Sequence, residues 1–324
     1  MGAQDFQLMF GDESTYATPV TVDRTYGYTS EDISEDWGRT ESDILRRGSA
    51  FPRDDVFTPY FKGAAGNVEM PVRTKGFGFF LEHMLGQVAT TGPAETSVYT
   101  HTGTEADILG KSLTCQVNRP FNPAGTDQAF TYAGGKITEW TLSNAAEGDL
   151  MLQLALDFAA QATATALASA SYDDDEPMSW VGGVVSIGGT DVDLDDITIT
   201  HNAGLNVDRR KIRGNAQKKE PKQGRRGGTF AIKADFESLA QRARVASATA
   251  AGAIAEIVAT WEGPTLLGTS IYPTLEVTLQ GRFDTWKTAT GSYDALQQEI
   301  GGIVVFDDTN SPIKLVYKSA DSTP

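Results

Sequence analysis

The chain has 324 residues, 40% of them apolar, and a formal net charge of −16, which is enough material for one large or two ordinary domains. Its single cysteine, Cys115, excludes an intrachain disulfide and a cysteine-clustered zinc site, and its acidity argues against general nucleic-acid binding. No apolar run of about 18 residues occurs and the first residues are acidic, so we expect neither a membrane span nor a signal peptide.

The first half of the chain alternates apolar and polar residues in several short runs, which is typical of strands with one buried face. Residues 20–38 are rich in Val, Thr and Tyr and indicate strands. The spacing of Phe77, Phe80, Leu81, Met84 and Leu85 predicts a short helix over 76–85. Further strands are predicted at 68–72, 98–102, 113–118, 130–133, 137–142 and 150–158.

The second half repeats this order after a small, polar and then acidic stretch, residues 161–177, which indicates a linker. Alternating runs at 230–234, 275–279 and 313–317 stand 162 to 163 residues after those at 68–72, 113–117 and 150–154, and a helical stretch at 237–246 follows the first of them. We interpret this as a tandem duplication of one β-rich domain. The expected boundaries are 1–160 for the first domain, 161–177 for the linker and 178–324 for the second.

The segment from Asp208 to Arg226, called the basic segment below, carries nine Lys and Arg against two acids, so its charge is +7 and that of the remaining chain is −23. It has no apolar periodicity and contains Gly214, Pro221 and Gly224, which favours a long extended loop. In the register of the duplication it occupies the place of the loop 38–65. Loops of this length are usually functional or disordered.

No motif predicts catalysis. Gly110–Lys111–Ser112 resembles the end of a phosphate-binding loop, but Glu105 stands where that loop needs glycine. Asp191, Asp193 and Asp195 have calcium-loop spacing without the required Gly and Glu, and a solvated turn is the simpler interpretation. The histidines His83, His101 and His201 lie on separate elements, and Cys115 falls among buried residues. We therefore expect a structural or binding protein that is no enzyme and holds no cofactor or metal.

Several stretches resemble the major tail tube proteins of long, non-contractile-tailed bacteriophages. They are GDESTYATPVTVDRTYGYTSEDI, GNVEMPVRTKGFGFFLEHMLG, VYTHT with SLTCQVNRP, KITEWTLSNAAEGDLMLQLALDF and ITITHNAGL, and together they span roughly residues 10 to 205. The resemblance implies a β-barrel or sandwich domain with a short packed helix and long inter-strand loops. The basic segment lies outside the matched stretches.

The resemblance also implies an assembly. Six such domains would form a ring around a channel, so a chain with two copies would close a ring of three subunits, and rings would stack through their long loops. Six subunits per ring remain an alternative if one half is only an ornament. The implied partners are other copies of the chain, a tape measure protein, and tail terminator or tip proteins. DNA would pass through without specific binding, in a virion tail assembled in the host cytoplasm. A baseplate, head-tail connector or adhesin-like protein on the same domain is the alternative function.

Two sets of residues follow as candidate sites for such an assembly. An acidic channel wall would not retain DNA, and the expected lumen-facing residues, for which an outer solvated face is the alternative, are Glu139, Gln153, Asp157, Glu276 and Thr278. The basic segment would dock on an acidic face of the adjacent ring and order on stacking, unless it only keeps the surface soluble. The expected ring-stacking residues are Arg46, Arg47, Arg209, Arg210, Lys211, Arg213, Lys218, Lys219, Arg225 and Arg226.

Overall fold

The computed structural model describes residues 6–44, 51, 56–95, 97–120, 127–289 and 296–324. The first half contains β1 (Gln7–Glu13), β2 (Arg24–Tyr26), β3 (Ser30–Glu31), β4 (Ser34–Glu41), β5 (Phe57–Pro71), α1 (Gly78–Leu85), β6 (Gly86–Ala94), β7 (Val98–Glu105), β8 (Ser112–Asn118), β9 (Ala129–Ala145), β10 (Met151–Phe158) and β11 (Ala160–Ala162).

The second half begins with a turn of 3₁₀-helix at Trp180–Gly182. It continues with β12 (Gly183–Ile187), β13 (Thr190–Asp191), β14 (Leu194–Asn202), β15 (Leu205–Asn206), β16 (Lys222–Gln223), β17 (Gly227–Asp235), α2 (Ala240–Val245), α3 (Ala250–Ala253), β18 (Ile254–Glu262), β19 (Thr274–Ala289), β20 (Gln297–Val304) and β21 (Ile313–Ser319). The prediction of a mainly β protein is confirmed.

The predicted short helix is also confirmed, and its apolar side chains form part of the hydrophobic core of the first half. Phe80, Leu81 and Leu85 on α1 are at most 1% exposed, and they pack in one hydrophobic core with β5, β8 and β10. The helix ends at Gly86, whose φ of 100° is the left-handed conformation that ends many helices. A side chain there would place its Cβ 2.4 Å from the carbonyl oxygen of Ala106, so only glycine fits.

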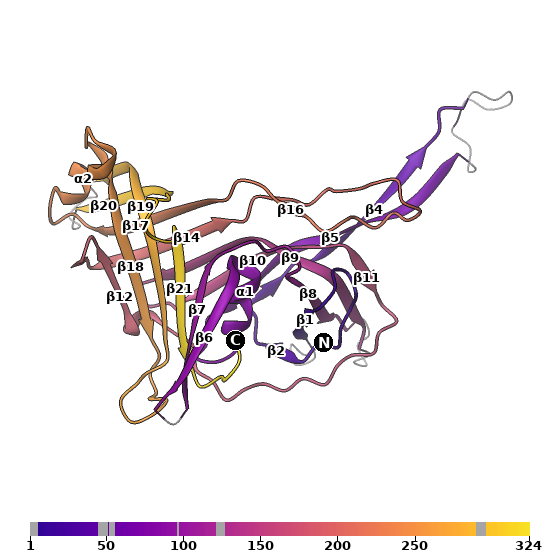
Figure 1. Cartoon of the computed structure of the whole chain (residues 1–324), viewed down its shortest axis with the longest axis horizontal. Coiled ribbons are helices and arrows are strands. Elements are labelled where there is room, and N and C mark those ends of the chain that lie inside the picture. The colour runs from indigo at the N-terminus through magenta and orange to yellow at the C-terminus, as the bar shows by residue number, and fades with distance from the viewer. Residues whose placement is uncertain (1–5, 45–50, 52–55, 96, 121–126, 290–295) are drawn as a thin grey trace.

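The two halves share one order of antiparallel strands (Figure 1). In the first half the hydrogen-bonded order is β1–β8–β9–β10–β5–β4. In the second half it is β12–β18–β19–β20–β17–β14. The short strands β11 and β21 pair in the same way with the first part of β9 and of β19. Six strands in each half therefore follow the same path in space.

This order corrects two of the three strand matches made from sequence. The match of β5 with β17, followed by a helix, agrees with the pairing. However, the strand equivalent to β8 is β18 rather than residues 275–279, and the strand equivalent to β10 is β20 rather than residues 313–317. The reason is the β6–β7 hairpin, Gly86–Glu105, which has no counterpart between the helix and β18 in the described part of the second half. Because of these 20 extra residues, equivalent positions of the two halves do not stay equally far apart in the sequence. The starts of α1 and α2, Gly78 and Ala240, are 162 residues apart, but the starts of β8 and β18, Ser112 and Ile254, are only 142 apart.

The halves join at a continuous sheet. β14 pairs with β9 from Asn202↔Glu139 to Asp196↔Ala145, so the strands β4, β5, β10, β9, β14, β17, β20 and β19 follow one another in register. A second junction pairs β21 with β7, which covers β21 with the extra hairpin. The hairpins β4–β5 and β14–β17 both extend in one direction, and α2 and α3 lie at the opposite end (Figure 1).

The stretch between the halves runs along the first half. The Gln7 side chain donates to the carbonyl of Ala168, and the Ala168 N–H donates to Gln116 Oε1, both at 2.8 Å. The acid run 173–176 is not simply solvated, because Asp175 forms an ion pair of 2.7 Å with Arg73. These contacts hold the linker against β1, β5 and β8.

Candidate assembly surfaces

The continuous sheet has one apolar and one polar face. On β9, β10 and β14 the residues Trp140, Leu142, Leu152, Leu154, Ile197 and Ile199 are buried in the core. The residues between them point to the other side, where the Thr141 and Thr200 hydroxyls lie 3.0 Å apart across the junction of the halves. The charged residues on this polar face include the acids Glu69, Glu139, Asp196, Asp235 and Glu299 and the cations Lys233, Arg282 and Lys287. Small uncharged side chains dominate, with a slight excess of acids.

The structure separates the five residues expected in the lumen. Glu139 and Gln153 lie on the polar face of β9 and β10, where Glu139 accepts a hydrogen bond of 2.9 Å from Asn202. Glu276 and Thr278 lie on the first part of β19, which pairs with β18 and β21 outside the continuous sheet. The alternation on β10 predicts an exposed Asp157, and this expectation is wrong, because Asp157 is only 7% exposed.

Asp157 is covered by the basic segment. Lys218 Nζ lies 2.5 Å from Asp157 Oδ1, and Lys218 is itself only 5% exposed. Burial raises the pKa of Asp157 above its ordinary value, and the ammonium of Lys218 opposes that rise. The expectation that Lys218 serves contacts between rings is therefore corrected: its charge is used inside the chain.

Glu220 forms a second anchor of the basic segment. Its Oε1 lies 2.6 Å from Lys136 Nζ and 2.6 Å from the N–H of Gly110. Lys136 is 2% exposed and also donates to the carbonyls of Ile108 and Lys111. Burial lowers the pKa of Lys136, and Glu220 opposes that effect. Sequence reasoning missed Lys136 and Glu220, because neither stands out from the surrounding charges.

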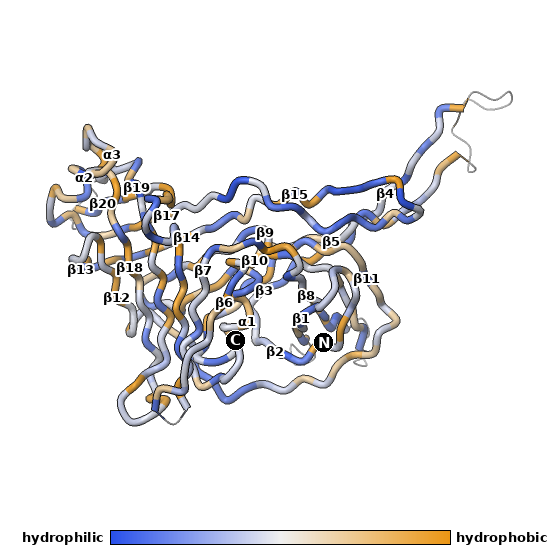
Figure 2. Tube along the Cα trace, in the orientation of Figure 1, coloured by the Kyte–Doolittle hydropathy of each residue, from blue (hydrophilic) through white to orange (hydrophobic). Residues whose placement is uncertain are grey.

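Two arginines hold the flanks of the basic segment to the first half. Arg226 forms an ion pair with Glu105 and donates to the carbonyl of Ala106. Arg210 donates to the carbonyl of Lys62 and pairs with Asp208. Figure 2 shows the hydrophilic stretch between β15 and β16 running beside β5. The segment, expected to be disordered in the free subunit, is thus ordered against its own chain here.

The remaining cations of the basic segment face outward. Exposed side chains that form no ion pair with a described residue are those of Lys211, Arg213, Lys219, Lys222 and Arg225. Arg209 is half-buried and donates to the carbonyl of Glu220. Arg46 and Arg47 lie outside the described residues.

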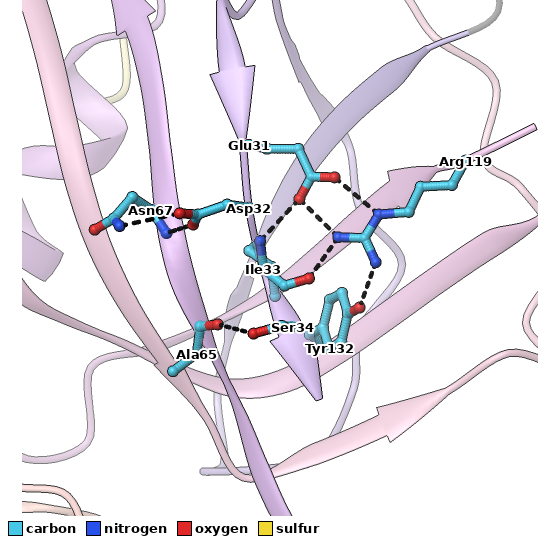
Figure 3. Close-up of polar contacts among 8 residues, drawn as sticks. All are labelled: Glu31, Asp32, Ile33, Ser34, Ala65, Asn67, Arg119 and Tyr132. Carbon is cyan, nitrogen blue, oxygen red and sulfur yellow. Dashed lines mark hydrogen bonds and ion pairs between the residues drawn. The ribbon is translucent and has the colours of Figure 1, made fainter. Parts of the chain in front are cut away.

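A partly buried polar cluster lies at the base of the β4–β5 hairpin (Figure 3). Arg119, just beyond β8, donates from Nε and Nη2 to the two carboxylate oxygens of Glu31 at 2.8 and 2.7 Å. It also donates to the carbonyl of Ile33 at 2.6 Å and to the Tyr132 hydroxyl at 3.1 Å. The next residue after Glu31, Asp32, accepts a hydrogen bond at its carboxylate from the N–H of Asn67 on the neighbouring strand β5. The planar guanidinium thereby binds the start of the hairpin to β8 and β9.

The other titratable residues form no site. Cys115 is buried, and burial raises the pKa of its thiol. Burial lowers the pKa of His83 to about 3, and that of His201 to about 4. Within the described residues no group of His, Cys, Asp and Glu is arranged to hold a metal ion. None of the described helices combines the length and the apolar character needed to cross a membrane.

A large antiparallel sheet with one polar face, unpaired end strands and projecting hairpins has the features of a protein that assembles with other copies through its sheet. Comparison with protein families makes this specific, because the model of the phage tail tube protein family matches residues 3–293. The chain therefore belongs to the phage tail tube family, and its role is that of a structural protein of the virion tail that associates with itself. A comparison with curated proteins finds none that matches the chain.

Proposed function

We propose that this protein forms rings that stack into the tail tube of a long, non-contractile-tailed phage, through which DNA is ejected. The observation that carries the proposal is the β9–β14 junction. It joins two equivalent sets of strands into one sheet, and the end strands of that sheet, β4 and the second part of β19, have no further strand partner within the described residues. Repeating the junction between chains would close the sheet and remove its edges.

The halves act in this proposal as two copies of one domain, residues 1–160 and 178–324, linked by 161–177. The equal strand order of the halves supports this division. Three chains then supply six domains, and the ring has pseudo-sixfold symmetry. A ring of six chains would contradict this part of the proposal without contradicting the tube.

The polar face of the continuous sheet would line the channel. Its short uncharged side chains, with the acids Glu69, Glu139, Asp196, Asp235 and Glu299 outnumbering the cations Lys233, Arg282 and Lys287, offer phosphate few cations to bind. The sheet's apolar face is already buried under the helices and the outer strands. Glu139 and Gln153 keep their proposed lumenal place, whereas Glu276 and Thr278 lie on the first part of β19, before the part that belongs to the continuous sheet.

The exposed cations at the end of the β14–β17 hairpin would contact the next ring. Arg46 and Arg47, which lie outside the described residues, are proposed to serve the same stacking contact. A tape measure protein and terminator or tip proteins would complete the tail after assembly in the host cytoplasm. Many copies of such a contact add up along a tube, so each one can be weak.

Electron microscopy of the purified full-length protein tests the proposal directly. We expect rods with a regular ring repeat, and three chains in each averaged ring. Closed particles that never elongate, at any protein or salt concentration, would reject the tube. Light scattering of the same samples would show whether the mass of the particles grows in proportion to the length of the rods.

A further inference from the structure

A groove with an apolar floor lies where β14 begins. Its volume is about 340 Å³, and its floor is formed by Val185, Ile197 and Trp261, which are 8, 4 and 2% exposed. The indole N–H of Trp261 donates at 3.0 Å to Asn144 Oδ1, which fixes the ring in the floor. Trp180 and Val181 stand at the wall with 46 and 76% of their surface exposed. Exposed apolar side chains beside a groove indicate a binding surface.

The rim of this groove is acidic. It carries Asp193, Asp195 and Asp196, and none of the three forms an ion pair with a described residue. Asp195 accepts a hydrogen bond of 2.8 Å from the Gln297 side chain, so its carboxylate keeps a free oxygen at the rim. Lys233 lies opposite Asp196 in the strand register but makes no ion pair with it. The groove therefore favours an apolar side chain flanked by cations.

The basic segment presents such a sequence at its tip, Lys211–Ile212–Arg213. Ile212 is fully exposed, with the highest relative exposure (109%) among the described large hydrophobic side chains. Arg213 donates at 2.7 Å to the carbonyl of Gln217, and Gly214 has a φ of 83°, so the tip is a closed turn. Ile212 makes no core contact, and its flanking cations are free of ion pairs with described residues.

The tip and the groove lie at opposite ends of the same strand. The groove is at the start of β14 and the basic segment follows its end, and nine residues of strand span about 30 Å. The two surfaces cannot meet within one chain in this arrangement. A contact between different surfaces of two copies is heterologous, and it extends into a linear stack instead of a closed dimer.

We propose that the tip Lys211–Arg213 of one copy docks in the groove of the next copy along the tube axis. Ile212 lies on the apolar floor, while Lys211 and Arg213 pair with Asp193 and Asp195. This deepens the proposed function and rests on it, since it identifies the acidic surface that receives the exposed cations. The acidic groove and the basic tip also prevent two copies from docking by like ends.

Disulfide capture tests the docking. The variant Ile212→Cys with Val181→Cys carries both partners on every chain, and the native Cys115 is buried and does not compete. Under mild oxidation at assembling concentration we expect a ladder of covalent multimers on a non-reducing gel. Each single variant, Ile212→Cys or Val181→Cys, forms no ladder. Rods of the double variant that give no ladder would reject the docking and leave the tube itself in place.

Charge exchange gives a second, independent test. The variant Lys211→Asp with Arg213→Asp is expected to raise the protein concentration needed for rods at least tenfold, and adding Asp193→Lys with Asp195→Lys is expected to restore it. A matched control is Lys314→Asp with Lys318→Asp, which removes two half-exposed cations of β21, outside the basic segment. Wild-type protein that forms no rods would contradict the proposed function, whereas rods unaffected by the tip variant would contradict only the docking.

Discussion

At the scale of single residues, the buried pair of Lys218 and Asp157 decides how the basic segment lies on its own chain. Replacing Lys218 by Met leaves an unpaired carboxylate below it and is expected to lower the free energy of unfolding by about 3 to 5 kcal/mol. The double variant Lys218→Met with Asp157→Leu removes both charges and is expected to recover most of this loss. Urea unfolding of the full-length subunit before assembly measures all three free energies.

The pH dependence of the Lys218→Met variant provides a control. Burial raises the pKa of Asp157 in the folded chain above its unfolded value, so the folded state takes up a proton more readily as pH falls. The loss caused by Lys218→Met should therefore be smaller near pH 5 than near pH 8. An equal loss at both values would mean that an unpaired carboxylate is not its cause.

His83 gives the opposite pH dependence. Burial first, and then the nearby charges of Lys136, Lys111 and Arg24, lower its pKa to about 3. The unfolded chain binds a proton at His83 near pH 6.5 and the folded chain does not, so stability falls as pH drops through this window. His83→Leu should remove about 2 kcal/mol of the stability lost between pH 6.5 and 5, measured by urea unfolding at both values. A His83→Leu variant whose stability still falls as steeply between pH 6.5 and 5 would show that His83 is not the group responsible.

At the scale of elements, the β4–β5 hairpin depends on Arg119 for its angle to the sheet. Arg119→Lys keeps the charge but cannot bind both Glu31 oxygens and the Ile33 carbonyl together. We expect a loss of about 1 to 3 kcal/mol and faster hydrogen exchange at residues 31–37. Arg39→Lys, farther out on β4, is the matched control and should leave this exchange unchanged. Equal exchange in both variants would show that Arg119 does not position the hairpin.

Local sequence patterns predict where the helices and strands of this protein lie better than they predict which strands and side chains pair with one another. The spacing of Phe80, Leu81 and Leu85 predicts α1, and the alternation on β10 predicts its buried face, because both depend only on neighbouring residues. The sequence indicates two separate strands at 130–133 and 137–142, whereas β9 is continuous. The interruption is Gly134–Gly135, where a Cβ on Gly135 would lie 2.6 Å from both Leu113 and Phe158, so glycine permits close packing there instead of ending the strand.

Long-range partners are harder to predict for two physical reasons. Alternating strands resemble one another, so a 20-residue hairpin, Gly86–Glu105, shifts the apparent repeat by one strand without disturbing any local pattern. Likewise, nothing local distinguishes Lys218, which is buried on Asp157, from its neighbour Lys219, which is exposed. The basic segment therefore has two functions that its composition does not separate: its flanks bind the first half, and its tip is free.

At the scale of the whole molecule, joining chains through the end strands should bury Trp37. This side chain lies on β4, is 61% exposed and packs against Phe61 with ring centroids 5.1 Å apart. If β4 of one chain continues the sheet at β19 of the next, water must leave the Trp37 ring. Acrylamide quenching of tryptophan fluorescence should then fall severalfold between free subunits and rods. Trp37→Phe identifies the part of this change that belongs to Trp37.

The quenching measurement must separate ring closure from ring stacking. Trp180 borders the groove and would be covered by the tip of the next copy, so stacking also protects a tryptophan. In the variant Lys211→Asp with Arg213→Asp, rings are expected to form without stacking. The Trp37 component should therefore be protected in these isolated rings, while the Trp180 component, identified with Trp180→Phe, should stay accessible in rings and be protected only in rods. A Trp37 component that stays accessible in both rings and rods would mean that the sheet is not closed through β4, whatever holds the rings together.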